Sequence, residues 1–426
     1  MNYLSMNKNE LEAAKETLQK QYRAYQEQGL KLDMSRGKPG ADQLDLSNDL
    51  LDVLGSQSDF RTENGLDARN YGGPDGIPEA KALFAELLGV APGEVFVGGN
   101  SSLNMMFDAV ACLMTHGVAG CEPWMKQGGV KFLCPVPGYD RHFAVTEYFS
   151  VEMLPVPMTP QGPDMDVVER LVSSDASVKG IWCVPKYSNP QGITYSDDTV
   201  RRFASLKPAA PDFRIFWDNA YCVHDISDTP DTLLNLMDEC KKQGNEDLPI
   251  LFCSTSKITF PGAGVAAMAA SEKNLAVFKR NYSFQTIGHD KLNQLRHVRY
   301  FHNVEGILSH MQRHKAILQP KFGAVIDLLE EELSGTGVAS WDHPNGGYFI
   351  SVDVLDGCAK RVVQLCREAG VTLTPAGATY PYGKDPRDAN IRIAPTLPPV
   401  SELEQAMQLF CLCVKLAAVD KLLGIL

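Results

Sequence analysis

The stretch PILFCSTSK, residues 249–257, decides the fold of this chain. Five apolar residues run into three hydroxyl side chains and end on Lys257, and a small-residue segment, PGAG at 261–264, follows. This pattern indicates a buried strand with a poorly solvated lysine at its end. Desolvation lowers the pKa of a lysine and frees its amine to attack carbonyl carbons, as a Schiff-base lysine requires. Taken alone, STSK fits a surface-loop lysine equally well.

The same pattern, a short apolar run that ends in a polar or glycine-rich loop, occurs seven times. The runs lie at 94–97, 131–134, 151–154, 180–184, 214–217, 250–253 and 265–268. Because amphipathic stretches separate most of them, they predict an α/β fold with a large, mainly parallel seven-stranded sheet between helices. Ligands bind at the carboxyl ends of strands in such sheets, so we expect the site in those loops.

The pattern changes after a long helical stretch, roughly 291–335. Two β-rich runs and two helices then predict a smaller α+β domain, and we expect the N-terminal helix to pack against it. The predicted division is residues 1–55 as an N-terminal part of the small domain, 56–310 as the large, ligand-binding domain, and 311–426 as the C-terminal small domain.

Composition excludes several classes of protein. The 426 residues carry a net charge of −12 and no basic block, which argues against nucleic acid as a partner. We expect no secretory signal and no membrane span, because no run approaches about 20 apolar residues. Eleven cysteines without a Cys-x-x-Cys pair fit a reduced, cytoplasmic setting and no zinc site. His310 and His314 share a helix face without a third ligand nearby, so we expect a solvated face there and no metal.

Two of the predicted strand ends suggest ligand contacts. Asn100, Ser101 and Ser102 follow two glycines and precede an apolar helix. The free N–H groups of a helix N-terminus attract anions, so this loop predicts either a phosphate site or ordinary capping. Tyr139 is fixed by nearby prolines and could lie flat on a planar ligand, with Arg141 in reach of a carboxylate. An exposed tyrosine in a surface turn is the alternative.

Two more strand ends supply an amide and a carboxylate. Asn189 lies in an Asn-Pro turn, and its carboxamide can also bond a ligand oxygen. Asp218 ends a very apolar strand, where burying a carboxylate unpaired is costly. Its partner is either a structural Arg or Lys or a protonated ring nitrogen. With Lys257, these loops supply the parts needed to hold pyridoxal phosphate, in an order that fits one sheet.

The chain resembles the fold-type I pyridoxal-phosphate enzymes, in particular the class I aminotransferases, over nearly its whole length. The specific motifs are SNPQG at 188–192, DNAY at 218–221, STSK at 254–257, NIRIA at 390–394 and YGGPDG at 71–76. Within the class, SRGKP at 35–39 and KITFPGAG at 257–264 are similar to the divergent bacterial branch of aspartate aminotransferases. That branch has been grouped with the aminotransferase-like domain of the MocR regulators.

The resemblance implies a role for each matching residue. Lys257 forms the Schiff base and shuttles a proton, Asp218 keeps the pyridine nitrogen protonated, and Asn189 and Tyr221 bond the phenolic oxygen. The remaining implied contacts are Tyr139 stacked on the ring, Asn100, Ser101, Ser102 and Ser254 on the phosphate, Tyr71 on the phosphate of a neighbouring subunit, and Arg392 with backbone near Gly37 on the substrate α-carboxylate.

The chain also departs from the family pattern. The arginine that the family usually has about eight residues after its lysine is missing, because 261–266 reads PGAGVA. The arginine for the substrate side-chain carboxylate has no clear counterpart. Arg141 is our candidate for it, ahead of Arg36 and then Lys38, and the segment 285–291 is expected to approach the site across a dimer interface.

The resemblance implies a cytoplasmic homodimer that transfers the amino group of L-aspartate to 2-oxoglutarate by a ping-pong mechanism. Its alternatives are transamination of another amino acid, such as aminoadipate, kynurenine or an aromatic, or a β-lyase or decarboxylase reaction. A pyridoxal-phosphate-binding regulatory module is a more remote one, since about 30 residues precede the SRGKP loop, too few for a winged helix-turn-helix.

Overall fold

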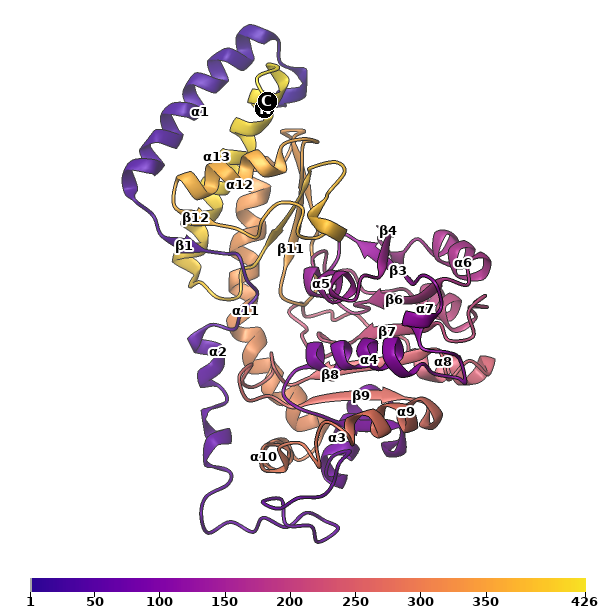
Figure 1. The fold of residues 1–426 in the computed structure, drawn as a ribbon. Helices are drawn as coiled ribbons and strands as arrows, with labels where there is room; N and C mark the ends of the chain where they lie inside the picture. Colours follow the sequence, from indigo (N-terminus) through magenta and orange to yellow (C-terminus); the bar gives the residue numbers. More distant parts are fainter. Residues whose placement is uncertain (1) are drawn as a thin grey trace.

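The computed structural model describes residues 2–426, and its largest element is an eight-stranded mixed sheet (Figure 1). In spatial order the strands are β2 (Val95–Val97), β9 (Ala266–Ala270), β8 (Pro249–Ser254), β7 (Arg214–Asp218), β6 (Val178–Cys183), β3 (Lys131–Val136), β4 (Glu152–Thr159) and β5 (Gly162–Pro163). All seven apolar runs form strands, and the two-residue β5 adds an antiparallel edge that the sequence did not predict.

The central strands β8, β7, β6, β3 and β4 are parallel, whereas β9 runs antiparallel to both of its neighbours. The predicted mainly parallel α/β sheet is therefore confirmed. Side chains of one strand enter two different cores, as Leu251 does on one face and Phe252 on the other. This alternation explains why the runs are apolar throughout, since both faces of a parallel sheet are covered by helices.

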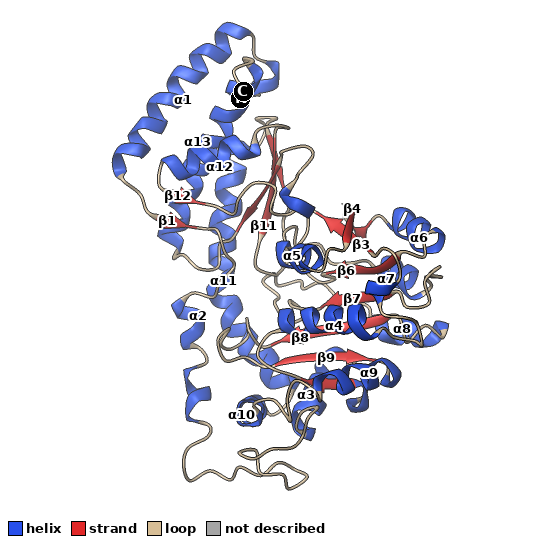
Figure 2. Cartoon of the chain, viewed as in Figure 1, coloured by secondary structure: helices blue, strands red, loops and turns tan. Residues whose placement is uncertain are grey.

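Helices cover both faces of the sheet (Figure 2). One core contains side chains of α3 (Pro78–Leu88), α6 (Met165–Ser174), α7 (Asp197–Ala204), α8 (Leu236–Gln243) and α10 (Lys291–Phe301). The other contains side chains of α4 (Ser102–His116), α5 (Asp140–Tyr148) and α9 (Glu272–Tyr282).

A second region carries two small sheets and the longest helices. Its strands are β10 (Ala339–Trp341), β11 (Ile350–Val354) and β13 (Asn390–Ile393) in one antiparallel sheet, and β1 (Leu32–Asp33) with β12 (Val371–Thr372) in a parallel pair. Its helices are α1 (Lys8–Gln28), α11 (Val304–Leu333), α12 (Ala359–Glu368) and α13 (Val400–Leu422). The chain between the two regions includes α2 (Ala41–Asp45).

Helix α1 packs against this second region, because Leu11, Leu18 and Tyr22 belong to its core and the Tyr22 hydroxyl donates to Leu365 O at 2.8 Å. Helix α11 contributes to both regions, since Ile307 packs with Ile258 while Phe322 belongs to the same core as α1. The division of the chain at residues 55 and 310 stays a prediction.

The long helical stretch expected over 291–335 is two helices. Helix α10 ends at Phe301, and Asn303 caps α11 by accepting a hydrogen bond from Gly306 N at 3.0 Å. A side-chain oxygen at an N-cap satisfies a backbone donor that the helix leaves open, so a single asparagine starts the second helix. None of the helices within residues 2–426 has the length and apolar character needed to span a membrane.

Candidate active site

Lys257 lies three residues beyond the end of β8, among polar and aromatic side chains. Its Nζ is 5.1 Å from the ring centre of Tyr221 and 5.7 Å from that of Tyr348. Burial lowers the pKa of the Lys257 ammonium, and the nearby Asp218 carboxylate opposes this shift. Desolvation disfavours the charged form of an amine, so this lysine is closer to a neutral nucleophile than an exposed one.

Asp218 ends β7 and is 2% exposed. Its Oδ2 lies 3.0 Å from His142 Nε2, and the His142 ring stacks on Trp182 with centroids 4.5 Å apart. The other carboxylate oxygen, Oδ1, is buried and has no hydrogen-bond partner among residues 2–426. Unpartnered buried oxygens are costly, so Oδ1 is held ready for a donor that the chain itself does not supply.

A cavity of about 160 Å³ joins Lys257 to this carboxylate. Its other polar lining residues are Ser101, Ser102, Tyr139, Asn189, Tyr221, Ser254 and Ser256. Ser101 is the N-cap of α4 and Ser102 its first residue, so the positive end of that helix faces one side of the cavity. Ser254 Oγ donates to Ser256 Oγ at 3.1 Å, which adds hydroxyls on the same side.

These residues fit pyridoxal phosphate. Hydroxyls and a helix N-terminus suit its phosphate, the orphaned Asp218 Oδ1 suits its ring N–H, and Lys257 lines the same cavity. The position eight residues after Lys257 is Val265, which is buried at 2% exposure. Along the described chain no arginine lines this cavity, so the helix N-terminus and the hydroxyls are left to balance the phosphate charge.

Two predicted cofactor contacts lie away from the cavity. The side-chain amide of Asn100 donates to Gly262 O at 3.3 Å, and the backbone carbonyl of Asn100 accepts from Ser256 Oγ at 3.0 Å, so Asn100 ties the two loops together. Tyr71 is 77% exposed. The phosphate contacts expected of Asn100 and Tyr71 stay predictions.

A larger cavity, of about 580 Å³, meets the first at Tyr139, Asn189, Tyr221 and Lys257. Besides Lys257, four basic side chains line it, namely Arg36, Lys38, Arg141 and Arg392. Gly37 lines it as well, and a Cβ atom there would lie 2.5 Å from Phe349 Cζ. Only glycine therefore lets this loop approach Phe349, the ring over which Arg392 is placed.

Arg392 comes from β13 and is held on several sides. Its guanidinium carbon is 4.7 Å from the Phe349 ring centre, and one terminal nitrogen lies 2.8 Å from Asp140 Oδ1 and 3.1 Å from Asn189 Oδ1. Its Nε is buried without a partner in the described chain. Arg392 lines the cavity, and a planar guanidinium held in one orientation suits the recognition of a carboxylate.

The model of the aspartate amino-transferase family matches residues 6–425. The chain belongs to this family of fold-type I, pyridoxal-phosphate-dependent aminotransferases. It is 48% identical over 426 residues to a Mycolicibacterium smegmatis protein named only as an aminotransferase, covering 100% of both chains. It is 46% identical over 406 residues to an aspartate aminotransferase of Corynebacterium glutamicum, covering 95% of this chain and 94% of that one.

A crystal structure of an aspartate transaminase from Corynebacterium glutamicum superposes with a TM-score of 0.96 at 44% identity, covering 99% of both chains. The recognition of the family and its fold, made from the motifs around Lys257, Asp218 and Asn189, is confirmed. The aminotransferase activity class is confirmed with it.

The loop that carries Lys257, Ile258 and Thr259, called the lysine loop below, packs on buried histidines that the sequence did not reveal. His310 and His314 place Nε2 at 2.9 and 3.0 Å from Ile258 O, and His297 Nε2 is 2.9 Å from the Thr259 hydroxyl. The solvated face predicted for His310 and His314 is wrong, because these residues are 5% and 1% exposed. The lysine loop and the segment near α2 cover that face of α11.

Burial lowers the pKa of His297 and of His314 to about 4 and lowers that of His310 as well. The three imidazole rings are therefore neutral near pH 7. A neutral imidazole can form the hydrogen bonds to the Ile258 carbonyl and the Thr259 hydroxyl. No cluster of three or more His, Cys, Asp or Glu side chains suited to a metal occurs within the part of the chain that the structure describes.

Sequence reasoning missed three further groups at the site, namely His142, Asp140 and Ser256. Ser256 lies inside the STSK motif, so the motif itself was a signal for it. His142 lies three residues after Tyr139, in the first turn of α5. A histidine so close to a predicted strand end was a weaker signal for a contact with the carboxylate. Asp140 gave no signal, because its partner Arg392 is 252 residues away.

Proposed function

We propose that this aminotransferase binds pyridoxal phosphate in the 160 Å³ cavity and transfers the amino group of L-aspartate to 2-oxoglutarate. The observation that supports cofactor binding is the unpartnered, buried Asp218 Oδ1 in the cavity that Lys257 also lines. The substrate proposal draws on the basic lining of the second cavity and on the relative from Corynebacterium glutamicum named as an aspartate aminotransferase.

Bound pyridoxal phosphate supplies a carbonyl carbon for the amine and a ring that accepts electrons from the substrate Cα. Lys257 acts as nucleophile and then takes and returns the Cα proton, which its lowered pKa favours. Asp218, braced by His142, keeps a proton on the ring nitrogen. Burial raises the pKa of Tyr221 well above its usual value, so its phenol stays protonated. With Asn189, it would bind the ring oxygen of the cofactor.

The substrate is held by its carboxylates in the larger cavity. Arg392 takes the α-carboxylate, with the backbone at Gly37 alongside. Arg141 at the rim takes the side-chain carboxylate, and Arg36 and Lys38 line the same cavity as the next candidates. Several cations around one cavity favour dianions over monocarboxylates by focusing the field, which is why aspartate and glutamate are the preferred amino acids.

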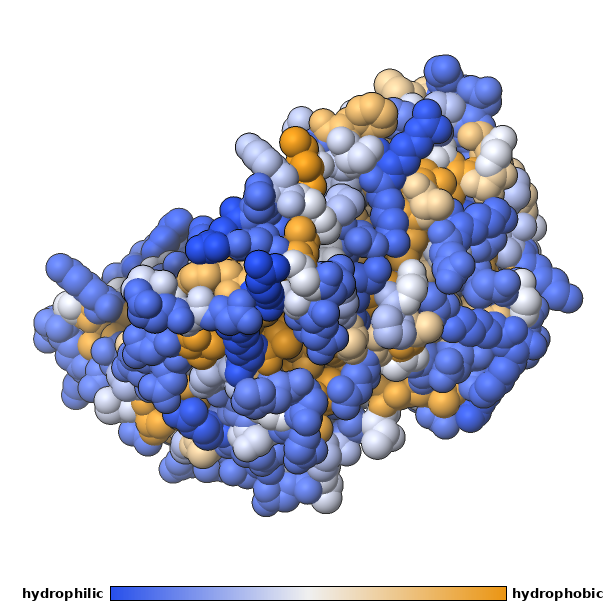
Figure 3. Space-filling view, turned by 90° about the horizontal axis from the view of Figure 1, so that it is seen from below, coloured by the Kyte–Doolittle hydropathy of each residue, from blue (hydrophilic) through white to orange (hydrophobic). Residues whose placement is uncertain are grey.

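The active form in this proposal is a homodimer, with Tyr71 reaching the phosphate of its partner. Tyr71, Phe284 and Ile287 are 77%, 80% and 63% exposed, and Gly72 and Gly288 of the same segments lie against each other. Seen from below, hydrophobic residues also show between the hydrophilic ones near the middle of the face (Figure 3). Exposed apolar groups mark association surfaces, and sedimentation of Phe284→Asp against the unchanged protein tests whether Tyr71, Phe284 and Ile287 belong to one.

A half-reaction screen tests the substrate. The loaded enzyme is mixed with one amino acid at a time, and conversion of the pyridoxal to the pyridoxamine form is followed by absorbance. Aspartate and glutamate are expected to convert it and alanine and tyrosine to do so far more slowly. Conversion by tyrosine, alanine or aminoadipate but not by aspartate assigns another transaminase. Release of ammonia or carbon dioxide without conversion assigns a β-lyase or decarboxylase.

A further inference from the structure

The arginine proposed to bind the substrate α-carboxylate already holds a carboxylate of its own chain. Asp140 Oδ1 lies 2.8 Å from a terminal nitrogen of Arg392, and the two side chains are 35% and 7% exposed. Asp140 also lines the substrate cavity with Arg36, Lys38 and Arg141. A negative charge thus lies among cations, at the place where an incoming carboxylate would be bound.

This contact is strong enough to matter for binding. A charge-assisted hydrogen bond to a largely buried guanidinium is stronger than a neutral one. A substrate carboxylate that reaches the same nitrogen must displace Asp140 or bind beside a like charge within a few ångströms, and both reduce its net gain. Arg392 has no other carboxylate within ion-pair distance in residues 2–426, so Asp140 is the competitor to consider.

The fold offers Asp140 a second resting place. Asp140 is the first residue of α5, and Tyr139 at the N-cap makes no side-chain hydrogen bond to the helix. A carboxylate in the first turn is stabilised by the helix dipole and by backbone N–H groups that lack intrahelical partners. The helix end therefore offers the Asp140 carboxylate a partner other than the guanidinium.

We propose that Asp140 is an internal competitor that occupies Arg392 until a substrate carboxylate displaces it onto the N-terminus of α5. This inference rests on the proposed role of Arg392 in substrate binding. It makes Asp140 a residue that sets the affinity for every carboxylate that uses Arg392, weakening all of them by a common factor. Before substrate enters, Asp140 also keeps a largely buried guanidinium paired, which is costly to leave uncompensated.

The test is calorimetric titration of the enzyme loaded with pyridoxal phosphate, using succinate and acetate, which carry no amino group and do not react. Asp140→Asn keeps the shape and an acceptor for Arg392 but removes the charge. The Asp140→Asn variant is expected to bind both anions roughly tenfold more tightly. This factor corresponds to the free energy of one partly exposed hydrogen bond between charged groups. Asp140→Glu keeps the charge and is expected to stay near the wild-type affinity.

Glu147→Gln is the matched control, because Glu147 lies on the same helix, is exposed and forms no ion pair in the described chain. It removes the same charge and is expected to leave both affinities unchanged. In an Arg392→Gln background, Asp140→Asn is expected to gain nothing. Unchanged or weaker anion binding by Asp140→Asn overturns the inference, and so does an equal gain without Arg392.

The same titrations separate this inference from the proposed function. If the wild-type enzyme binds succinate no better than acetate, the preference for dicarboxylates fails. The effect of Asp140→Asn on acetate still decides whether Asp140 competes for Arg392.

Discussion

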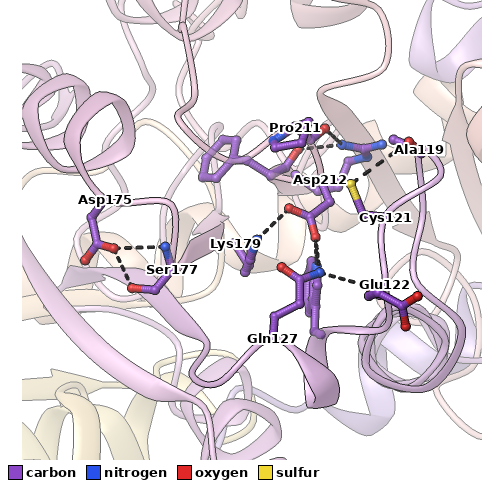
Figure 4. A network of polar contacts seen from close by, with 12 residues as sticks. Ala119, Cys121, Glu122, Gln127, Asp175, Ser177, Lys179, Pro211 and Asp212 are labelled. Atoms are coloured by element: carbon purple, nitrogen blue, oxygen red, sulfur yellow. Dashed lines mark hydrogen bonds and ion pairs between the residues drawn. The ribbon is translucent and has the colours of Figure 1, made fainter.

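Two buried carboxylates lie at opposite ends of β7, and they are treated in opposite ways. Asp212, just before the strand, accepts hydrogen bonds from Lys179 Nζ at 2.7 Å and Gln127 Nε2 at 2.8 Å (Figure 4). It also accepts one from Trp124 Nε1 at 3.1 Å. Asp218, at the other end, has His142 on one oxygen and nothing within residues 2–426 on the other. Both are at most 2% exposed, so burial alone does not separate them.

The lysines differ in the same way. Lys179 Nζ is ion-paired to Asp212, whereas Lys257 Nζ forms no ion pair in the described part of the chain and its pKa is lowered by burial. A buried charge whose hydrogen bonds the protein itself supplies helps to specify the fold. A buried charge that the protein leaves without a partner indicates a site for a ligand. The comparison predicts that the two ends respond differently to mutation.

Lys257→Ala is expected to have the largest effect, the loss of all measurable transamination. Within residues 2–426 no other amine lines the cofactor cavity. The unfolding free energy of the apoenzyme should stay the same or rise, because a desolvated lysine is removed. Activity assays and urea unfolding of the same sample check both. A variant that still transaminates would sink the assignment of Lys257.

Lys179→Met is expected to do the reverse. It leaves Asp212 buried without its cation, which costs about 3–5 kcal/mol of unfolding free energy, while the folded fraction keeps its activity per molecule. Urea unfolding measures the loss. Lys126→Met, at an exposed pair with Glu122, is the control and should change stability by less than about 1 kcal/mol. Equal losses in both variants would contradict the comparison.

Mild acid should weaken the support of the lysine loop. The pKa of His297 and of His314 lies near 4 in the fold because of burial and near 6.5 in the unfolded chain. The unfolded chain therefore binds more protons between these values, and stability falls as pH falls from 6.5 toward 4. Between pH 7.5 and pH 5 each histidine should cost about 2 kcal/mol.

Unfolding free energies at the two pH values check this. His314→Asn should shrink the difference by the contribution of one histidine, whereas replacing the exposed His116 should leave it unchanged. A wild-type stability that is flat between pH 7.5 and pH 5 would rule the effect out.

Arg141→Ala is expected to have the smallest and most selective effect. The residue is exposed at the rim of the substrate cavity, so stability should not change. The KM for aspartate should rise by about tenfold, since one partly solvated charge contact is lost, and the KM for alanine should hardly move. Arg36→Ala and Lys38→Ala run in parallel identify which cation holds the distal carboxylate, and an equal change for both substrates excludes Arg141.

The sequence determined the sheet and the main chemistry of the site. The seven apolar runs form strands because a strand that helices cover on both faces of its sheet must be apolar throughout. Parallel strands end at one edge, which brings residues such as Asp218 and Lys257 together. These features are local or follow from topology, so the SNPQG, DNAY and STSK motifs sufficed for them.

Tertiary structure alone decided what surrounds those residues. The pairing of Asp140 with Arg392 joins side chains 252 residues apart, and the burial of His310 and His314 depends on which loop covers α11. No period or motif records such contacts, because they arise from how whole helices and loops pack against one another. The identity of each charged group can be read from the chain, but whether it is satisfied or left waiting for a ligand is set by packing.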